Sequence, residues 1–185
     1  RRIPVTTRAP AIGFFVSAII ASLGFLVVSY WVFNPAALPP KPMEADPDLR
    51  HVLDNFWWLS FLATFFGIVL TQVIGKITEY FTAVEHKPVR EIAAAAKTGP
   101  ATLLLTGLAE GLESSVWGIV SIAATIFGAF LLFHNPAMAA YAIALTGLGL
   151  LATTGYVLAM DTYGPISDNA NGIFEMSGAL KNSDG

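Results

Sequence analysis

The sequence predicts an all-α membrane protein, a polytopic bundle of transmembrane helices. Of its 185 residues, 55% are hydrophobic and only 12% are charged, and the mean hydropathy is +0.63. Soluble domains carry about 25% charged residues. The apolar residues gather into four runs, each near the roughly 20 residues that a helix needs to cross the hydrocarbon. These runs must be helical, because an open sheet would leave backbone groups unpaired in lipid.

We expect four spans, at about residues 9–33, 55–84, 100–133 and 137–161. The first contains 25 residues without a charge. The second continues beyond its apolar part as an amphipathic helix, because Ile77, Tyr80, Phe81 and Val84 recur at helical spacing. The third carries two acids near its start, and a turn at residues 134–136 separates it from the fourth.

Three segments connect or follow the spans. Residues 34–54 hold five prolines, which exclude a long helix, and we expect an exterior loop. Residues 76–99 form a loop on the other side, and within it we expect a short helix at 89–97 with Pro88 in its first turn. Residues 161–185 form a last loop that carries the candidate motif.

The basic residues set the orientation. Eight of the ten fall on the side that holds both ends of the chain and the 76–99 loop, namely Arg1, Arg2, Arg8, Lys76, Lys87, Arg90, Lys97 and Lys181. Since positive charge concentrates in cytoplasmic loops, we expect both ends and the 161–176 motif in the cytoplasm.

The stretch from Asp161 to Met176 is the strongest candidate site. It follows 47 residues, from Ser114 to Met160, that contain no Asp, Glu, Lys or Arg. Acid at the mouth of a span is costly and marks a site for cations or their complexes. Pro165 would clash with the Asp161 carbonyl, so we expect a kink at residues 163–165 or a new helix there. Asp161 and Asp168 would then face one cavity with oxygen donors that suit Mg²⁺.

Several residues have a plain structural explanation beside the functional one. Both aspartates could merely cap helix ends, and Asn169 could form a turn instead of binding in the cavity. Glu110 and Glu113 could lie on an ion path, but their place near the start of the third span slightly favours the cytoplasmic lip. The three histidines are scattered over loops on both sides, and the chain has no cysteine for a thiol metal site. The net charge of −3 offers no basic surface for nucleic acid.

The motif resembles that of the membrane-integral, ion-pumping inorganic pyrophosphatases. Their signature reads Asp-x-Tyr-Gly-Pro-Ile-x-Asp-Asn-Ala-Gly-Gly-Ile-x-Glu-Met, and residues 161–170 match it throughout. Residues 77–82 and 97–102 are similar to a cytoplasmic loop of that family, and 107–109 to its next helix, so the likeness covers most of 56–178. The departures are Asn171 and Phe174, where the family has a glycine and a small residue, and Glu110, where we expect an apolar one.

This resemblance implies hydrolysis of pyrophosphate coupled to pumping of H⁺ or Na⁺. It implies a sixteen-helix subunit, of which the four spans would be helices eight to eleven, and a homodimer. Asp168 would hold magnesium pyrophosphate together with Asn169, and Asp161 would support it. Mg²⁺ is the implied cofactor, and K⁺ is open as an activator. Because the chain lacks an initiator Met and stops soon after the motif, we expect a piece of a larger protein. The alternative is a non-hydrolytic cation transporter or channel that uses the Asp161 and Asp168 cavity.

Overall fold

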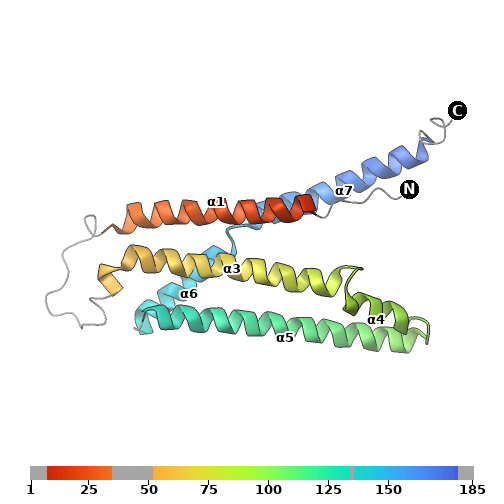
Figure 1. Cartoon of the computed structure of the whole chain (residues 1–185), viewed down its shortest axis with the longest axis horizontal. Coiled ribbons are helices and arrows are strands. Elements are labelled where there is room, and N and C mark those ends of the chain that lie inside the picture. The colour runs from red at the N-terminus through yellow and green to blue at the C-terminus, as the bar shows by residue number, and fades with distance from the viewer. Residues whose placement is uncertain (1–7, 35–51, 134–135, 179–185) are drawn as a thin grey trace. The chain divides into compact units, whose positions relative to one another are not determined.

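A computed structural model describes residues 8–34, 52–133 and 136–178. Every extended element in these ranges is an α-helix (Figure 1). The helices are α1 (Arg8–Phe33), α3 (Phe56–Thr82), α4 (Lys87–Ala95), α5 (Pro100–Phe133), α6 (Pro136–Leu150) and α7 (Thr154–Met176). Most of the expected exterior loop, the turn at 134–135 and the tail from 179 onward lie outside the described residues.

Four helical segments are long and apolar enough to cross a membrane, which confirms the predicted all-α fold with four spans. They are Ile12–Phe33, Phe56–Ala95, Pro100–Phe133 and Met138–Met176. The third span begins and ends at the predicted residues. Its start is set by Gly99 and Pro100, which interrupt the helix before it. Gly99 has φ 135°, a left-handed value that an L residue rarely adopts, and Pro100 opens α5.

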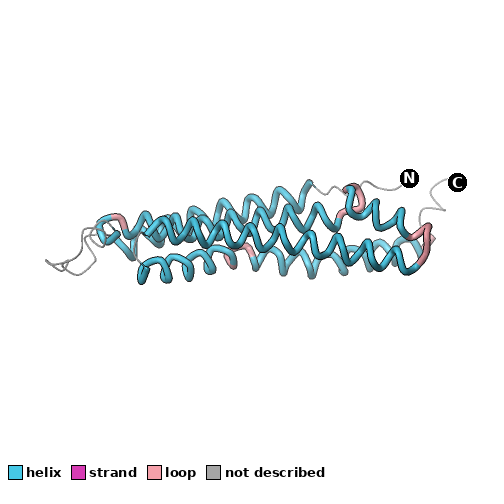
Figure 2. The backbone as a smooth tube through the Cα atoms, turned by 90° about the horizontal axis from the view of Figure 1, so that it is seen from below, coloured by secondary structure: helices cyan, strands magenta, loops and turns pink. Residues whose placement is uncertain are grey.

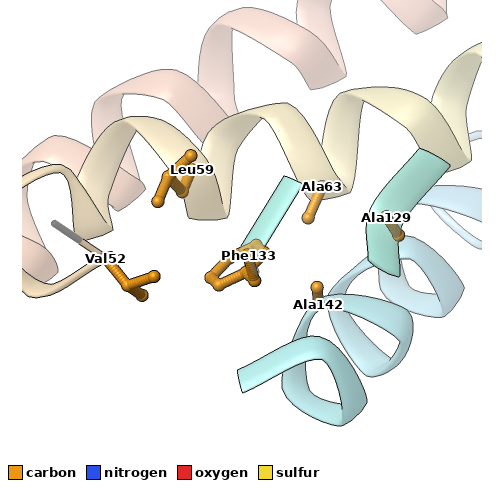
Figure 3. Packing of buried hydrophobic residues seen from close by; sticks show 6 residues of the cluster. All are labelled: Val52, Leu59, Ala63, Ala129, Phe133 and Ala142. Carbon is orange, nitrogen blue, oxygen red and sulfur yellow. The ribbon is translucent and has the colours of Figure 1, made fainter. Parts of the chain in front are cut away.

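The chain divides into two compact units, and residues 21–152 form the larger one. Its core lies where α3, α5 and α6 meet. Six buried residues fill it, namely Val52, Leu59, Ala63, Ala129, Phe133 and Ala142 (Figure 3). The ring of Phe56 packs against the core, 6.4 Å from the ring of Phe133 and 5.6 Å from that of Tyr141. The three alanines leave room for the helices to approach closely.

Helices α3 and α6 approach each other closely. A Cβ atom on Gly67 would overlap the carbonyl oxygen of Thr146, and one on Gly149 would overlap that of Thr64. The two helices therefore touch backbone to backbone, which only glycine permits. One turn beyond Gly67, the Thr71 hydroxyl donates to the carbonyl oxygen of Leu150 at 2.8 Å.

Helix α4 joins α3 to α5 as the sequence predicts, although its bounds differ by two residues. α3 ends at Thr82 and α4 spans 87–95 with Pro88 in its first turn. Short turns flank it (Figure 2). The turn into α5 is tied by two hydroxyls, because those of Thr98 and Thr102 lie 2.7 and 3.1 Å from the Ala95 carbonyl oxygen.

The smaller unit combines residues 1–20 with residues 153–185. In its described part, α7 rests on the first half of α1 through Tyr156. The hydroxyl of Tyr156 lies so close to Gly13 that a Cβ there would overlap it. The ring of Phe14 lies 6.3 Å from that of Tyr156. Gly13 on α1 thus leaves the space that the Tyr156 side chain, near the start of α7, occupies.

For residues 161–176, the predicted loop and the alternative of a new helix at Pro165 are wrong, whereas a kink at residues 163–165 stays a prediction. The chain remains helical through Pro165, and residues 161–176 belong to α7 instead of a loop. The helix is interrupted earlier, at residues 151–153, between α6 and α7 (Figure 2). Proline is tolerated inside membrane helices because the freed groups find other partners. The earlier stretch is weakened by Gly147, Gly149 and two threonines, which are poor helix formers.

Candidate functional site

The continuous helix α7 gathers three carboxylates on one face. Asp161, Asp168 and Glu175 are spaced seven residues apart, so each is turned by only roughly 20° from the one before. Successive members lie about 10 Å apart along the helix axis. All three side chains are exposed. A continuous helix therefore produces the shared face that a kink or new helix was expected to produce.

Gly164, Pro165 and Gly172 lie beside these carboxylates. A Cβ on Gly164 or Gly172 would meet nothing within 4 Å, so the face carries little bulk between its acids. Pro165 has no N–H to give to the Asp161 carbonyl, its partner in a regular helix. That carbonyl oxygen is consequently a further acceptor on the acidic face.

The opposite face of α7 is apolar. Tyr163, Ile166 and Ile173 are each more than 60% exposed, and α7 buries no residue within the described part of the chain. Apolar side chains on one face and carboxylates on the other fit a helix that borders lipid or protein on one side and a polar space on the other.

The two asparagines of the motif differ in their surroundings. Asn169 follows Asp168 directly and is therefore turned by about 100° from it, to the edge of the acidic face. Asn171, which stands where the resembling family has glycine, donates from Nδ2 to Oε1 of Glu175 at 3.1 Å. This side chain restrains the third carboxylate, a role that glycine could not have.

The donor set fits Mg²⁺ only with help from other oxygens. Among the described residues, no group of three His, Cys, Asp or Glu side chains is arranged to hold a metal ion. Mg²⁺ binds oxygen at about 2.0–2.1 Å, so two carboxylates about 10 Å apart cannot bind the same ion directly. Protein sites for Mg²⁺ do, however, often use one or two carboxylates with substrate phosphates and water. A single aspartate of α7 can serve in such a site.

Glu110 and Glu113 lie in the larger unit. Glu110 is half-buried beside Glu91 of α4 and in the field of Lys87, whose Nζ is 3.1 Å from Oε1 of Glu91. Glu113 is exposed. The structure therefore places Glu110 at the contact between α4 and α5, near the start of the third span.

The comparison with known protein families agrees with the motif. The family model described as inorganic H⁺ pyrophosphatase matches residues 5–184. The chain belongs to the inorganic H⁺ pyrophosphatase family. Its apolar spans and its membership of this family of membrane pumps make it part of an integral membrane protein.

Curated members of the inorganic H⁺ pyrophosphatase family are similar along most of the chain. A K⁺-insensitive pyrophosphate-energized proton pump of Streptomyces coelicolor is 42% identical over 91% of this chain and 21% of its own length. One from Chloroflexus aurantiacus is 48% identical over 68% of this chain and 17% of its own. A Bacteroides thetaiotaomicron protein named a putative K⁺-stimulated pyrophosphate-energized sodium pump is 39% identical over 68% of this chain and 18% of its own length.

This chain thus spans about a fifth of the length of these relatives. No solved structure matches it.

Proposed function

We propose that the full-length protein hydrolyses inorganic pyrophosphate and couples this reaction to the pumping of H⁺ or Na⁺ across the membrane. The acidic face of α7, in a chain of the inorganic H⁺ pyrophosphatase family, carries the proposal. The similar proteins are named for proton or sodium pumping energised by pyrophosphate. A sixteen-helix subunit that forms a homodimer, with the motif in the cytoplasm, belongs to the same proposal.

Asp168 is the residue that we assign to the magnesium pyrophosphate complex. Its carboxylate is exposed on α7, and within the described ranges it has no ion-pair partner that would compete with a cation. Pyrophosphate is strongly anionic and would be repelled by bare carboxylates. Bound Mg²⁺ would supply the charge neutralisation that lets a carboxylate hold a phosphate. Asn169, at the edge of the same face, is assigned to the substrate oxygens.

Asp161 has a supporting role in this proposal. It lies about 10 Å from Asp168 along the helix, too far to bind the same ion. Its carboxylate would hold a second cation or add negative potential that attracts one. The family members named above include K⁺-insensitive and K⁺-stimulated pumps, so we do not extend the proposal to K⁺.

The test is Mg²⁺-dependent phosphate release from pyrophosphate by membrane vesicles that hold the full-length protein. We expect Asp168→Asn to lower the rate by more than the roughly 10- to 100-fold that loss of an outer-shell partner costs at a metal site. Asp161→Asn should reduce it less. Glu85→Gln, a change at an exposed acid in the turn before α4, is the matched control and should leave the rate unaltered.

An Asp168→Asn protein that releases phosphate at the wild-type rate would contradict the assigned role. Wild-type vesicles that transport a cation but release no phosphate from pyrophosphate would favour the non-hydrolytic transporter.

A further inference from the structure

The helix α7 begins inside the hydrocarbon layer of the membrane. α6 has 15 residues and rises only roughly 22 Å, which is less than the hydrocarbon thickness of about 30 Å. α7 starts at Thr154 and carries no charged residue before Asp161, which lies about 10 Å further along the helix axis. The first turn of α7 is therefore apolar on its far side as well, and lipid offers it no hydrogen-bond partner.

Two N–H groups of this first turn have no backbone partner. A helix leaves its first four N–H groups without acceptors in the helix itself. In the described part of the chain, no backbone carbonyl accepts from the N–H of Thr154 or Gly155, whereas the N–H of Val157 donates to the Thr153 carbonyl oxygen at 3.1 Å. Unpaired N–H groups are costly in hydrocarbon, so these two require an acceptor.

The hydroxyl of Thr153 is a second polar group at the same helix end. Thr153 is the N-cap residue of α7, but its backbone is not extended and its side chain makes no capping hydrogen bond. It is only 1% exposed, and its Oγ1 is buried without a hydrogen-bond partner among the described residues. Thr146 and Thr162, by contrast, donate to carbonyls of the preceding turn. Thr153 therefore has unused hydrogen-bonding capacity at the start of α7.

These groups select a small neutral ligand. The N–H groups only donate, while the hydroxyl both donates and accepts. The 1% exposure of Thr153 leaves no opening for a side chain from another helix. A Cβ on Gly155 would meet nothing within 4 Å, so there is room beside the first turn. A water molecule suits a polar site of this size with two to four partners, whereas the positive end of the helix repels a cation.

We propose that an ordered water molecule binds at the start of α7 and completes its N-cap. This water accepts from the N–H groups of Thr154 and Gly155 and donates to Oγ1 of Thr153. A bridging water is nearly as favourable in enthalpy as a direct hydrogen bond, so it replaces the missing side-chain cap. All three residues belong to the smaller unit. The water explains how a transmembrane helix can begin within hydrocarbon.

Amide hydrogen exchange of the full-length protein in lipid nanodiscs tests this site. Exchange requires water at the N–H group. We expect Thr154 and Gly155 to exchange at least about fivefold faster than Val157, the factor that corresponds to one ordinary hydrogen bond. Exchange as slow as that of Val157 would show that another group of the full-length protein holds these N–H groups, and it would overturn the proposal.

Variants of Thr153 distinguish a bound water from a frayed helix end. Thr153→Val removes the hydroxyl with little change in shape, so the water loses a partner. We expect exchange of Thr154 and Gly155 to become about fivefold slower, and Thr153→Ser to behave like the wild type. A frayed end would exchange equally fast or faster in Thr153→Val, and either result would contradict the bound water.

Thr146→Val is the matched control. It removes the hydroxyl of another buried threonine, but one that already donates to the Ala142 carbonyl oxygen at 2.9 Å. It should leave the exchange of Thr154 and Gly155 unaltered. If Thr153→Val does not accumulate in membranes, Thr153→Cys takes its place with the same expectation, because a thiol is a weak donor and acceptor. No measurement in this series uses pyrophosphate, so its outcome does not depend on the proposed function.

Discussion

Pro165 shows how one side chain can change an acidic face without carrying charge. It lies within α7, where a proline removes one helical hydrogen bond and leaves the Asp161 carbonyl without its usual N–H partner. This oxygen joins the carboxylates of Asp161 and Asp168 on one side of the helix. The face thus gains an acceptor at the place where the helix is locally weakest.

Replacement of Pro165 by alanine should strengthen α7. A proline in a helix interior costs about 3 kcal/mol relative to alanine, so Pro165→Ala should raise the free energy of local opening by up to that amount. The measurement is amide hydrogen exchange of residues 161–169 in the full-length protein, which should become slower. Pro100→Ala is the control, because Pro100 opens α5, where its missing N–H would have no helical partner. Equal slowing in both variants would contradict this explanation.

At the scale of helices, the α3–α6 contact depends on glycines that face backbone. Gly149 is in contact with the Thr64 carbonyl, whereas Gly118 on α5 has open space where a Cβ would lie. Two glycines in membrane helices therefore have different roles. One permits a close approach, and the other has no packing neighbour among the described residues.

This difference predicts opposite effects of one substitution. Gly149→Ala should destabilise the protein by about 1–3 kcal/mol, the usual cost of overpacking, because α3 and α6 must separate. Gly118→Ala should be neutral, or stabilising by up to about 1 kcal/mol through helix propensity. Unfolding of the purified full-length protein by titration with SDS would measure both. Similar free energies of unfolding for the two variants would show that α3 and α6 can accept a side chain at Gly149 without separating.

For the whole chain, the parts that lipid dictates could be predicted from the sequence. The number of spans and the bounds of the third follow from the long apolar runs, since backbone in hydrocarbon must be helical. The shared face of Asp161 and Asp168 follows from their spacing of seven. The break at residues 151–153 was missed, although Gly147, Gly149 and two threonines are poor helix formers at this place. Pro165 was the stronger local signal in the sequence, yet α7 continues through it.

The orientation of the chain is the last prediction. Eight of ten basic residues fall on the side of the 76–99 segment and the chain ends, while Lys41 and Arg50 fall on the other. The positive-inside rule then predicts that the end of α7 lies in the cytoplasm. This chain has no cysteine, so single cysteines report cleanly once those elsewhere in the full-length protein are removed. With an impermeant maleimide, Glu85→Cys and Ser177→Cys should react in inside-out vesicles, and Pro39→Cys in right-side-out ones. Reaction of Ser177→Cys from the exterior would put the acidic face of α7 on the side opposite to cytoplasmic pyrophosphate and would contradict the proposed site.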